Sequence, residues 1–125
     1  MIDIAELLTE LHTAIYSNKL IVRSIASSAV SYSMTSKDNA INLVIERSCD
    51  LKYDHGKRGI IAKYSMSWRI RIYQHPTFNY NIEEDTNNYL YVKASSILDM
   101  CESKVKENCN ADSILSSLRI INEHR

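Results

Sequence analysis

Residues 60–73 read IIAKYSMSWRIRIY, and this stretch decides the fold. Apolar and aromatic residues fill every even position, whereas the basic residues Lys63, Arg69 and Arg71 stand at odd positions. A repeat of two residues is the pattern of a β-strand that turns one face toward the core and the other toward solvent or a partner. We therefore predict a long strand here. It ends before Pro76, because proline has no N–H to donate to a neighbouring strand.

Apolar repeats on either side of this strand predict the other elements. Residues 3–17 have the spacing of an amphipathic helix that begins at Asp3. Residues 20–33 are ambiguous, because their apolar positions recur on one side of a helix while their Val, Ile, Ser and Tyr content favours a strand. We take the helix there. Further along we predict a strand over about 40–47, with a continuation to Lys52 as the alternative, a polar loop over 77–88 and a strand over 89–94. We predict a helix that is capped by Ser95 or Ser96 and ends near Asn108, and a last helix that is capped by Asn110 or Asp112 and carries Ile114 to Ile121.

The fold class predicted from these elements is α+β, in the order ααβββαα. A small antiparallel β-sheet of about three strands is packed with N-terminal and C-terminal helices. A length of 125 residues suits a single domain over 1–125. With only two glycines and one proline, the chain lacks the composition of linkers, so we expect order nearly end to end.

Composition also bears on the compartment. No apolar run approaches the roughly 20 residues that a membrane-spanning helix needs, and the first six residues hold two acids and no basic residue. The three cysteines, Cys49, Cys101 and Cys109, form an odd set without a close pair, which argues against a disulfide framework or a zinc knuckle. We expect a cytoplasmic protein, in the host cell if the gene belongs to a phage.

Charge is distributed unevenly along the chain although the net charge is zero. Residues 57–81 hold five basic residues and no acidic one, while residues 1–56 and 82–125 each carry an acidic excess. Such a segment creates a local positive field in a neutral molecule. The central strand is therefore the first place to look for a binding surface.

The candidate surface is the outward side of the strands over 60–73 and 89–94. If the two strands pair as a hairpin, one face carries basic and tyrosine side chains. These partner-binding candidates are Lys63, Arg69, Arg71, Tyr73, Tyr89, Tyr91 and Lys93. Arginine and tyrosine are typical anchors of protein interfaces, and they also hold phosphates and stack on bases. A plain solvated sheet face is the third interpretation of the same residues.

Catalytic and metal motifs are not evident in the sequence. The four histidines stand in four different predicted elements without metal-ligand spacing, and there is no G-x-S-x-G. We therefore predict no catalytic residues, no metal and no cofactor, and we lean against an enzyme. A small enzyme with dispersed site residues stays an alternative.

Two short segments resemble a known family. Trp68-Arg69-Ile70-Arg71-Ile72-Tyr73-Gln74-His75 is followed, after a polar stretch, by Tyr91-Val92-Lys93-Ala94-Ser95. Over about residues 67–105 this is similar to a small phage-encoded anti-CRISPR family that inhibits Cas9. That family has a basic N-terminal arm, whereas this chain begins with an acid-capped helix. The resemblance implies a small mobile-element protein that binds and blocks a host machine.

The leading hypothesis is thus a non-catalytic binding protein. It is a phage or mobile-element inhibitor of a bacterial defence complex, and it blocks a protein or nucleoprotein surface. Direct nucleic-acid binding through the basic aromatic face is the second hypothesis, and a small enzyme is the third. A homo-oligomer is compatible with each, because a small sheet has edges to protect.

Overall fold

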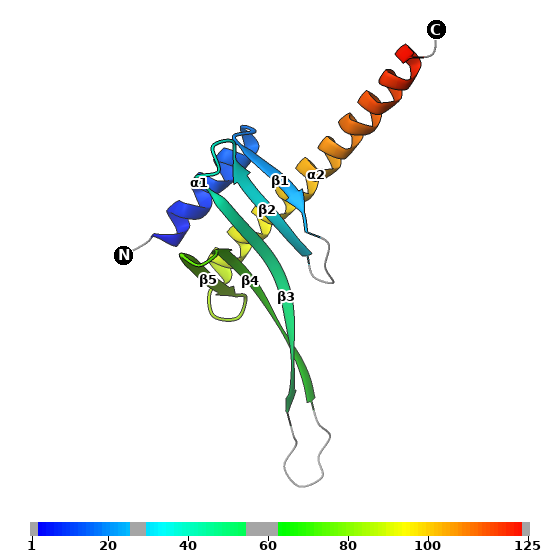
Figure 1. The fold of residues 1–125 in the computed structure, drawn as a ribbon. Helices are drawn as coiled ribbons and strands as arrows, with labels where there is room; N and C mark the ends of the chain where they lie inside the picture. The colour runs from blue at the N-terminus through cyan, green and yellow to red at the C-terminus, as the bar shows by residue number, and fades with distance from the viewer. Residues whose placement is uncertain (1–2, 26–29, 55–62, 124–125) are drawn as a thin grey trace.

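The computed structural model describes residues 3–25, 30–54 and 63–123, without the side chains of 52–54, 63, 64 and 109–112. A helix, five strands and a second helix follow one another in the chain. They are α1 (Ile4–Tyr16), β1 (Leu20–Ser24), β2 (Val30–Ser36), β3 (Asn42–Asp54), β4 (Lys63–Gln74), β5 (Phe78–Glu83) and α2 (Asn88–Glu123). The strands form one antiparallel sheet in the order β1-β2-β3-β4-β5. Both helices lie on one face of this sheet and pass behind it in Figure 1.

The first helix confirms its prediction. Asp3 caps it, with its side-chain oxygen accepting from the Glu6 N–H at 3.2 Å. Its buried residues follow the spacing of one helix face: Ile4, Leu8, Leu11 and Ile15. Ser17 is the C-cap, and Asn18 after it adopts a positive φ of 60°, a left-handed conformation that asparagine tolerates better than most residues.

The helix predicted over 20–33 is wrong, because the chain forms β1 and β2 instead. Leu20 and Val22 are buried while Ile21 between them is exposed, so the side chains alternate as in a strand. β1 pairs with β2 so that Val22 lies opposite the buried Met34. The β-branched content therefore outweighed the apparent helical repeat. Residues 26–29, which contributed to that repeat, lie outside the described residues.

The two central strands confirm the strands predicted over 40–47 and 60–73, and β3 runs to Asp54, just past the alternative end at Lys52. β3 and β4 pair without interruption from Val44 opposite Tyr73 to Asp54 opposite Lys63. Ile70 and Ile72 of β4 are buried, as the even positions were predicted to be. Of the predicted strand 60–73, residues 60–62 lie outside the described residues.

The polar loop predicted over 77–88 is wrong, since its first half is the edge strand β5. Phe78 and Tyr80 are half-buried, Ile82 is fully buried, and the asparagines between them are exposed. This is again a repeat of two. Asparagine is rare in strands, but here it faces solvent, so its poor strand propensity costs little.

The strand predicted over 89–94 and the two helices after it are corrected to one helix, α2. The Asn87 side chain caps it by accepting from the Leu90 N–H at 3.2 Å. Leu90 and Tyr91 are adjacent and both buried, which a strand with one buried face cannot achieve. No glycine or proline stands between 88 and 123 to break the helix where the sequence predicted a boundary.

A single apolar layer joins the sheet to the helices. It is made by Leu20, Val22, Met34, Leu43, Ile45, Ile70, Ile72 and Ile82 from the sheet and by Ile4, Leu8, Leu11, Ile15, Leu90, Tyr91, Ala94, Ile97, Leu98 and Cys101 from the helices. The α+β class therefore holds for the described chain. The sheet of about three strands and the order ααβββαα do not, because the sheet has five strands and residues 89–94 are helical.

This layer gives a direct test with a matched control. Ile70→Ala removes a side chain that is 0% exposed at the centre of the sheet, and it should lower the free energy of unfolding by about 2–5 kcal/mol. Ile120→Ala removes the same atoms from an exposed helix position and should change it by less than about 0.5 kcal/mol. Urea unfolding followed by circular dichroism measures both. Equal losses in the two variants would contradict the assigned core.

Candidate functional site

The sheet has an open face, opposite the helices, and β4 places its charged side chains there. Because Ile70 and Ile72 point into the core, the alternating residues Arg69, Arg71 and Tyr73 point the other way. The guanidinium of Arg71 lies 4.1 Å from the centre of the Tyr73 ring, within cation–π range. These three predicted site residues therefore do share one face.

Carboxylates from β3 lie beside both arginines. The register sets Glu46 opposite Arg71, and Arg71 Nη1 lies 3.5 Å from Glu46 Oε1. Arg69 Nη1 lies 3.6 Å from Asp50 Oδ2. On the other side, Arg71 Nε donates to Asn79 Oδ1 of β5 at 2.9 Å. We call this set, Glu46, Asp50, Arg69, Arg71, Tyr73 and Asn79, the arginine row.

The arginine row is close to neutral, which the sequence did not predict. Arg69 and Arg71 are each matched by one carboxylate, and Glu83 of β5 lies opposite Arg69 in the sheet. The two arginine side chains are 37% and 38% exposed, so both can still be reached from solvent. The row offers planar donors and acceptors side by side rather than a uniformly positive surface.

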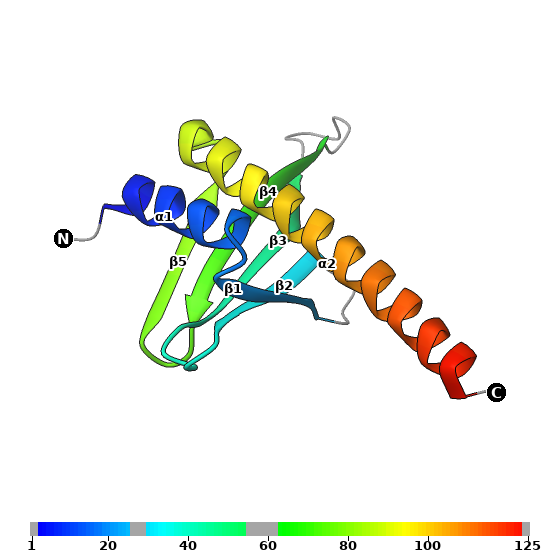
Figure 2. The ribbon, with the colours of Figure 1, turned by 90° about the horizontal axis from the view of Figure 1, so that it is seen from above.

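Three of the other four predicted site residues do not join this face, and the side chain of the fourth, Lys63 at the start of β4, is not described. Tyr89, Tyr91 and Lys93 lie on α2, which covers the opposite face of the sheet (Figures 1 and 2). The shared face was predicted from a strand over 89–94, so that part of the prediction is wrong. Partner binding by any of the seven residues stays a prediction.

The three residues on α2 have structural contacts of their own. Tyr91 is buried in the core, and this burial raises the pKa of its hydroxyl, against the opposing effect of the nearby Arg47 charge. Lys93 Nζ donates to Thr9 Oγ1 of α1 at 2.8 Å and lies 5.7 Å from the centre of the Tyr89 ring. Tyr91 and Lys93 therefore contribute to holding α2 in place.

Sequence reasoning missed the acidic half of the row. Glu46 and Asp50 stand at even positions of β3, on the side away from the buried Ile45. A hairpin register that sets Glu46 against Arg71 brings opposite charges together, and such cross-strand pairs are favourable. The acidic residues of β3 could have been predicted to pair with the arginines from this charge pattern, but only if the register between β3 and β4 had been known.

Concave regions among the described residues include two that lie away from the row. One, of about 340 Å³, lies between the helices and is lined by Leu8, Thr9, His12, Thr13, Lys93 and Ser96. Its hydroxyl groups are committed, since Thr9, Thr13 and Ser96 each donate to a main-chain carbonyl of their own helix. The other, of about 260 Å³, is mainly apolar and is lined by Leu7, Ile41, Leu43, Gln74 and Phe78.

Reactive and metal-binding groups are sparse in the described chain. Within residues 3–25, 30–54 and 63–123, no cluster of three or more described His, Cys, Asp or Glu side chains could hold a metal ion. Burial raises the pKa of the Cys101 thiol to about 12, so this cysteine is held as an unreactive thiol in the core. None of the helices within those ranges is long and apolar enough to cross a membrane.

Comparisons with known proteins add no relative. No family model, no curated protein and no solved structure matches this chain.

The half-exposed ion pairs of the row should matter little for the fold. Glu46→Gln keeps the shape of the side chain and removes its charge, so the free energy of unfolding should fall by only about 0.2–1 kcal/mol. Chemical denaturation at low and high salt measures this, and the difference from the unmodified protein should shrink as salt screens the pair. A loss above about 2 kcal/mol would show that the row is chiefly a stabilising device.

Proposed function

We propose that this chain is a non-catalytic binding protein that docks a protein partner on the open face of its sheet, through the arginine row. The observation that carries the proposal is the row itself. Two half-exposed arginines, a stacked tyrosine and two carboxylates line one sheet face that neither helix covers. Arginine and tyrosine are enriched among the residues that dominate binding energy at protein interfaces.

A protein partner fits the row better than a nucleic acid does. Nucleic-acid affinity comes largely from cations that neutralise phosphates. Here Arg69 and Arg71 already lie within 3.6 Å of Asp50 and Glu46, and a phosphate would have to approach those carboxylates as well. A protein surface can pair with both the arginines and the carboxylates, because it offers hydrogen-bond donors and acceptors together.

The finer form of the proposal concerns the partner. The resemblance of residues 68–75 and 91–95 to an anti-CRISPR family supports an inhibitor encoded by a phage or mobile element. Such an inhibitor would occlude a surface of a bacterial defence complex. This step rests on the sequence alone, whereas the docking face rests on the geometry of the row.

The test compares two double variants in cells that carry the gene. Tagged protein is used to capture partners, and the captured protein is then purified and titrated against each variant. Arg71→Ser with Tyr73→Ser removes the stacked pair of the row and should weaken binding at least tenfold. Glu102→Ala with Lys106→Ala removes an exposed ion pair of 2.9 Å on α2, behind the sheet, and should leave affinity unchanged.

Two results would contradict the proposal. One is an equal affinity of the row variant and the unmodified protein for the purified partner, with both folded by circular dichroism. The other is capture that disappears on nuclease treatment, together with a retardation of RNA or DNA that weakens steeply with salt. The second result would support the nucleic-acid hypothesis instead.

A further inference from the structure

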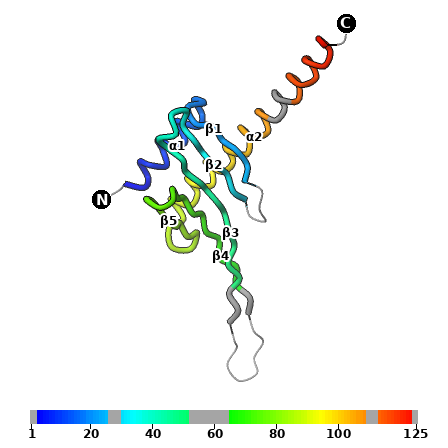
Figure 3. Tube along the Cα trace, in the orientation of Figure 1, coloured from blue at the N-terminus to red at the C-terminus, as the bar shows by residue number. Residues whose placement is uncertain are grey.

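The far half of α2 extends beyond the sheet and carries uncovered apolar residues. Figures 1 and 3 show the helix leaving the sheet and continuing toward the C-terminus. Ile114, Leu115, Leu118 and Ile121 are 46–65% exposed, although they follow the i, i+1, i+4, i+7 spacing of one helix face. We call these four residues the distal stripe. An apolar side of this kind is not expected on a helix segment that contacts only water.

The distal stripe does not continue the side of α2 that packs on the core. At about 100° per residue, it points roughly 120° away from the direction of the buried Ala94 and Cys101. It points instead to the side on which Lys93 Nζ lies 2.8 Å from Thr9 Oγ1 of α1, and Lys104 Nζ lies 2.9 Å from Asn18 Oδ1 just after α1. A longer sheet in this chain would therefore not cover the stripe.

A second uncovered apolar surface lies on the β3–β4 hairpin. Leu51 and Met66 are opposite one another and 63% and 62% exposed, and Trp68 beside them is 37% exposed. Met66 and Trp68 lie on the same side of β4 as the buried Ile70. They therefore belong to the sheet face that the helices cover, but to a part of it that the helices leave exposed. We call Leu51, Met66 and Trp68 the arm patch. This exposure differs from the sequence prediction, which buried every even position.

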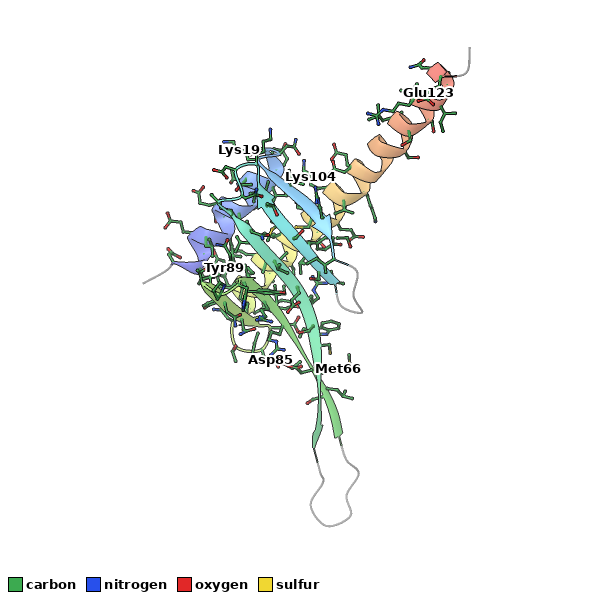
Figure 4. The ribbon with its side chains drawn as sticks, viewed as in Figure 1. Lys19, Met66, Asp85, Tyr89, Lys104 and Glu123 are labelled. Atoms are coloured by element: carbon green, nitrogen blue, oxygen red, sulfur yellow. The ribbon has the colours of Figure 1, made fainter. Side chains whose placement is uncertain are left out.

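The two surfaces lie on parts of the chain that leave the sheet in different directions. In Figure 4 the labelled Met66 and Glu123 mark the hairpin and the helix end, which leave the sheet in diverging directions. We propose that two copies of this chain assemble about a twofold axis, with the distal stripe of each copy on the arm patch of the other. The twofold axis makes this contact occur twice, because the helix of each copy then lies beside the hairpin of the other.

The packing mode is already present in the fold. The near half of α2 lays the apolar side that carries Ile97 and Leu98 on the core of the sheet, and α2 contacts β1, β4 and β5. A helix on a sheet face buries the apolar side of both. The proposed contact repeats this arrangement between copies, using the part of the helix and the part of the hairpin that are left uncovered in their own chain.

The area available favours the reciprocal contact over a simple pairing of two stripes. Each of the seven side chains leaves roughly 50–100 Å² exposed. Two stripes packed together would remove only about 400–800 Å² from water, the range of crystal contacts. Two stripes on two arm patches would remove about 700–1,400 Å², which reaches the range of stable interfaces.

The experiment is sedimentation equilibrium of the full chain, whose monomer mass is 14.4 kDa. The unmodified protein should form a dimer. Leu118→Glu in the stripe and Met66→Lys in the arm patch should each raise the dimer dissociation constant at least tenfold. Ile120→Glu is the matched control, because Ile120 is 56% exposed on the same helix but points away from the stripe. It should leave the dimer intact.

Mixing the two disruptive variants distinguishes the reciprocal contact from other arrangements. In a mixed dimer, the glutamate introduced into the stripe of one copy would face the lysine introduced into the arm patch of the other. The second contact would be unmodified, so the dimer should return. A monomeric unmodified protein would overturn the proposal. So would failure of the mixture to restore the dimer, or equal disruption by Ile120→Glu, with folding of each variant checked by circular dichroism.

The substituted residues lie off the arginine row, so the outcome is independent of the proposed function. Loss of the dimer with an unchanged affinity for a captured partner would leave the row intact as a docking face. Conversely, the double variant Arg71→Ser with Tyr73→Ser should lose partner binding and keep the dimer. That result would show that the dimer does not depend on the arginine row.

Discussion

The structure depends on one layer of aliphatic contacts between the sheet and the helices. Ile45, Ile70 and Ile72 at the centre of β3 and β4 are almost completely buried, and the apolar sides of α1 and α2 close over them. Figure 2 shows how the two helices lie across the strands. A meander of five strands would leave both faces in water, so burial of one face by the helices is what makes the sheet stable.

That constraint also determines which surfaces are left for partners. Because both helices cover the same face, the other face stays open, and the odd positions of β4 bring Arg69, Arg71 and Tyr73 onto it. Because the helices cover only part of their own face, Met66 on the hairpin stays exposed. The two proposed interactions therefore use opposite sides of the sheet and can coexist in one molecule.

The sequence predicted the elements whose repeat is long and whose two sides differ clearly. α1 and β4 are of this kind, and the face that carries Arg69 and Arg71 follows from β4 alone. Residues 20–33 and 89–94 were misassigned because a short apolar run fits either repeat, and only tertiary pairing decides between them. The carboxylates beside the arginines could not be predicted without the strand register. The exposure of Met66 depends on which part of the sheet the helices cover, and the sequence around Met66 does not predict that.

The central claim is that α2 is one helix with two apolar sides, one packed on its own sheet and one left for another molecule. Amide hydrogen exchange along α2, in a solution dilute enough to keep single copies, tests it most directly. Amides around Ala94–Cys101 should exchange as slowly as those at the centre of β3 and β4, and amides around Ile114–Ile121 should exchange orders of magnitude faster. Uniform protection along the whole helix, or fast exchange in its near half, would contradict the account.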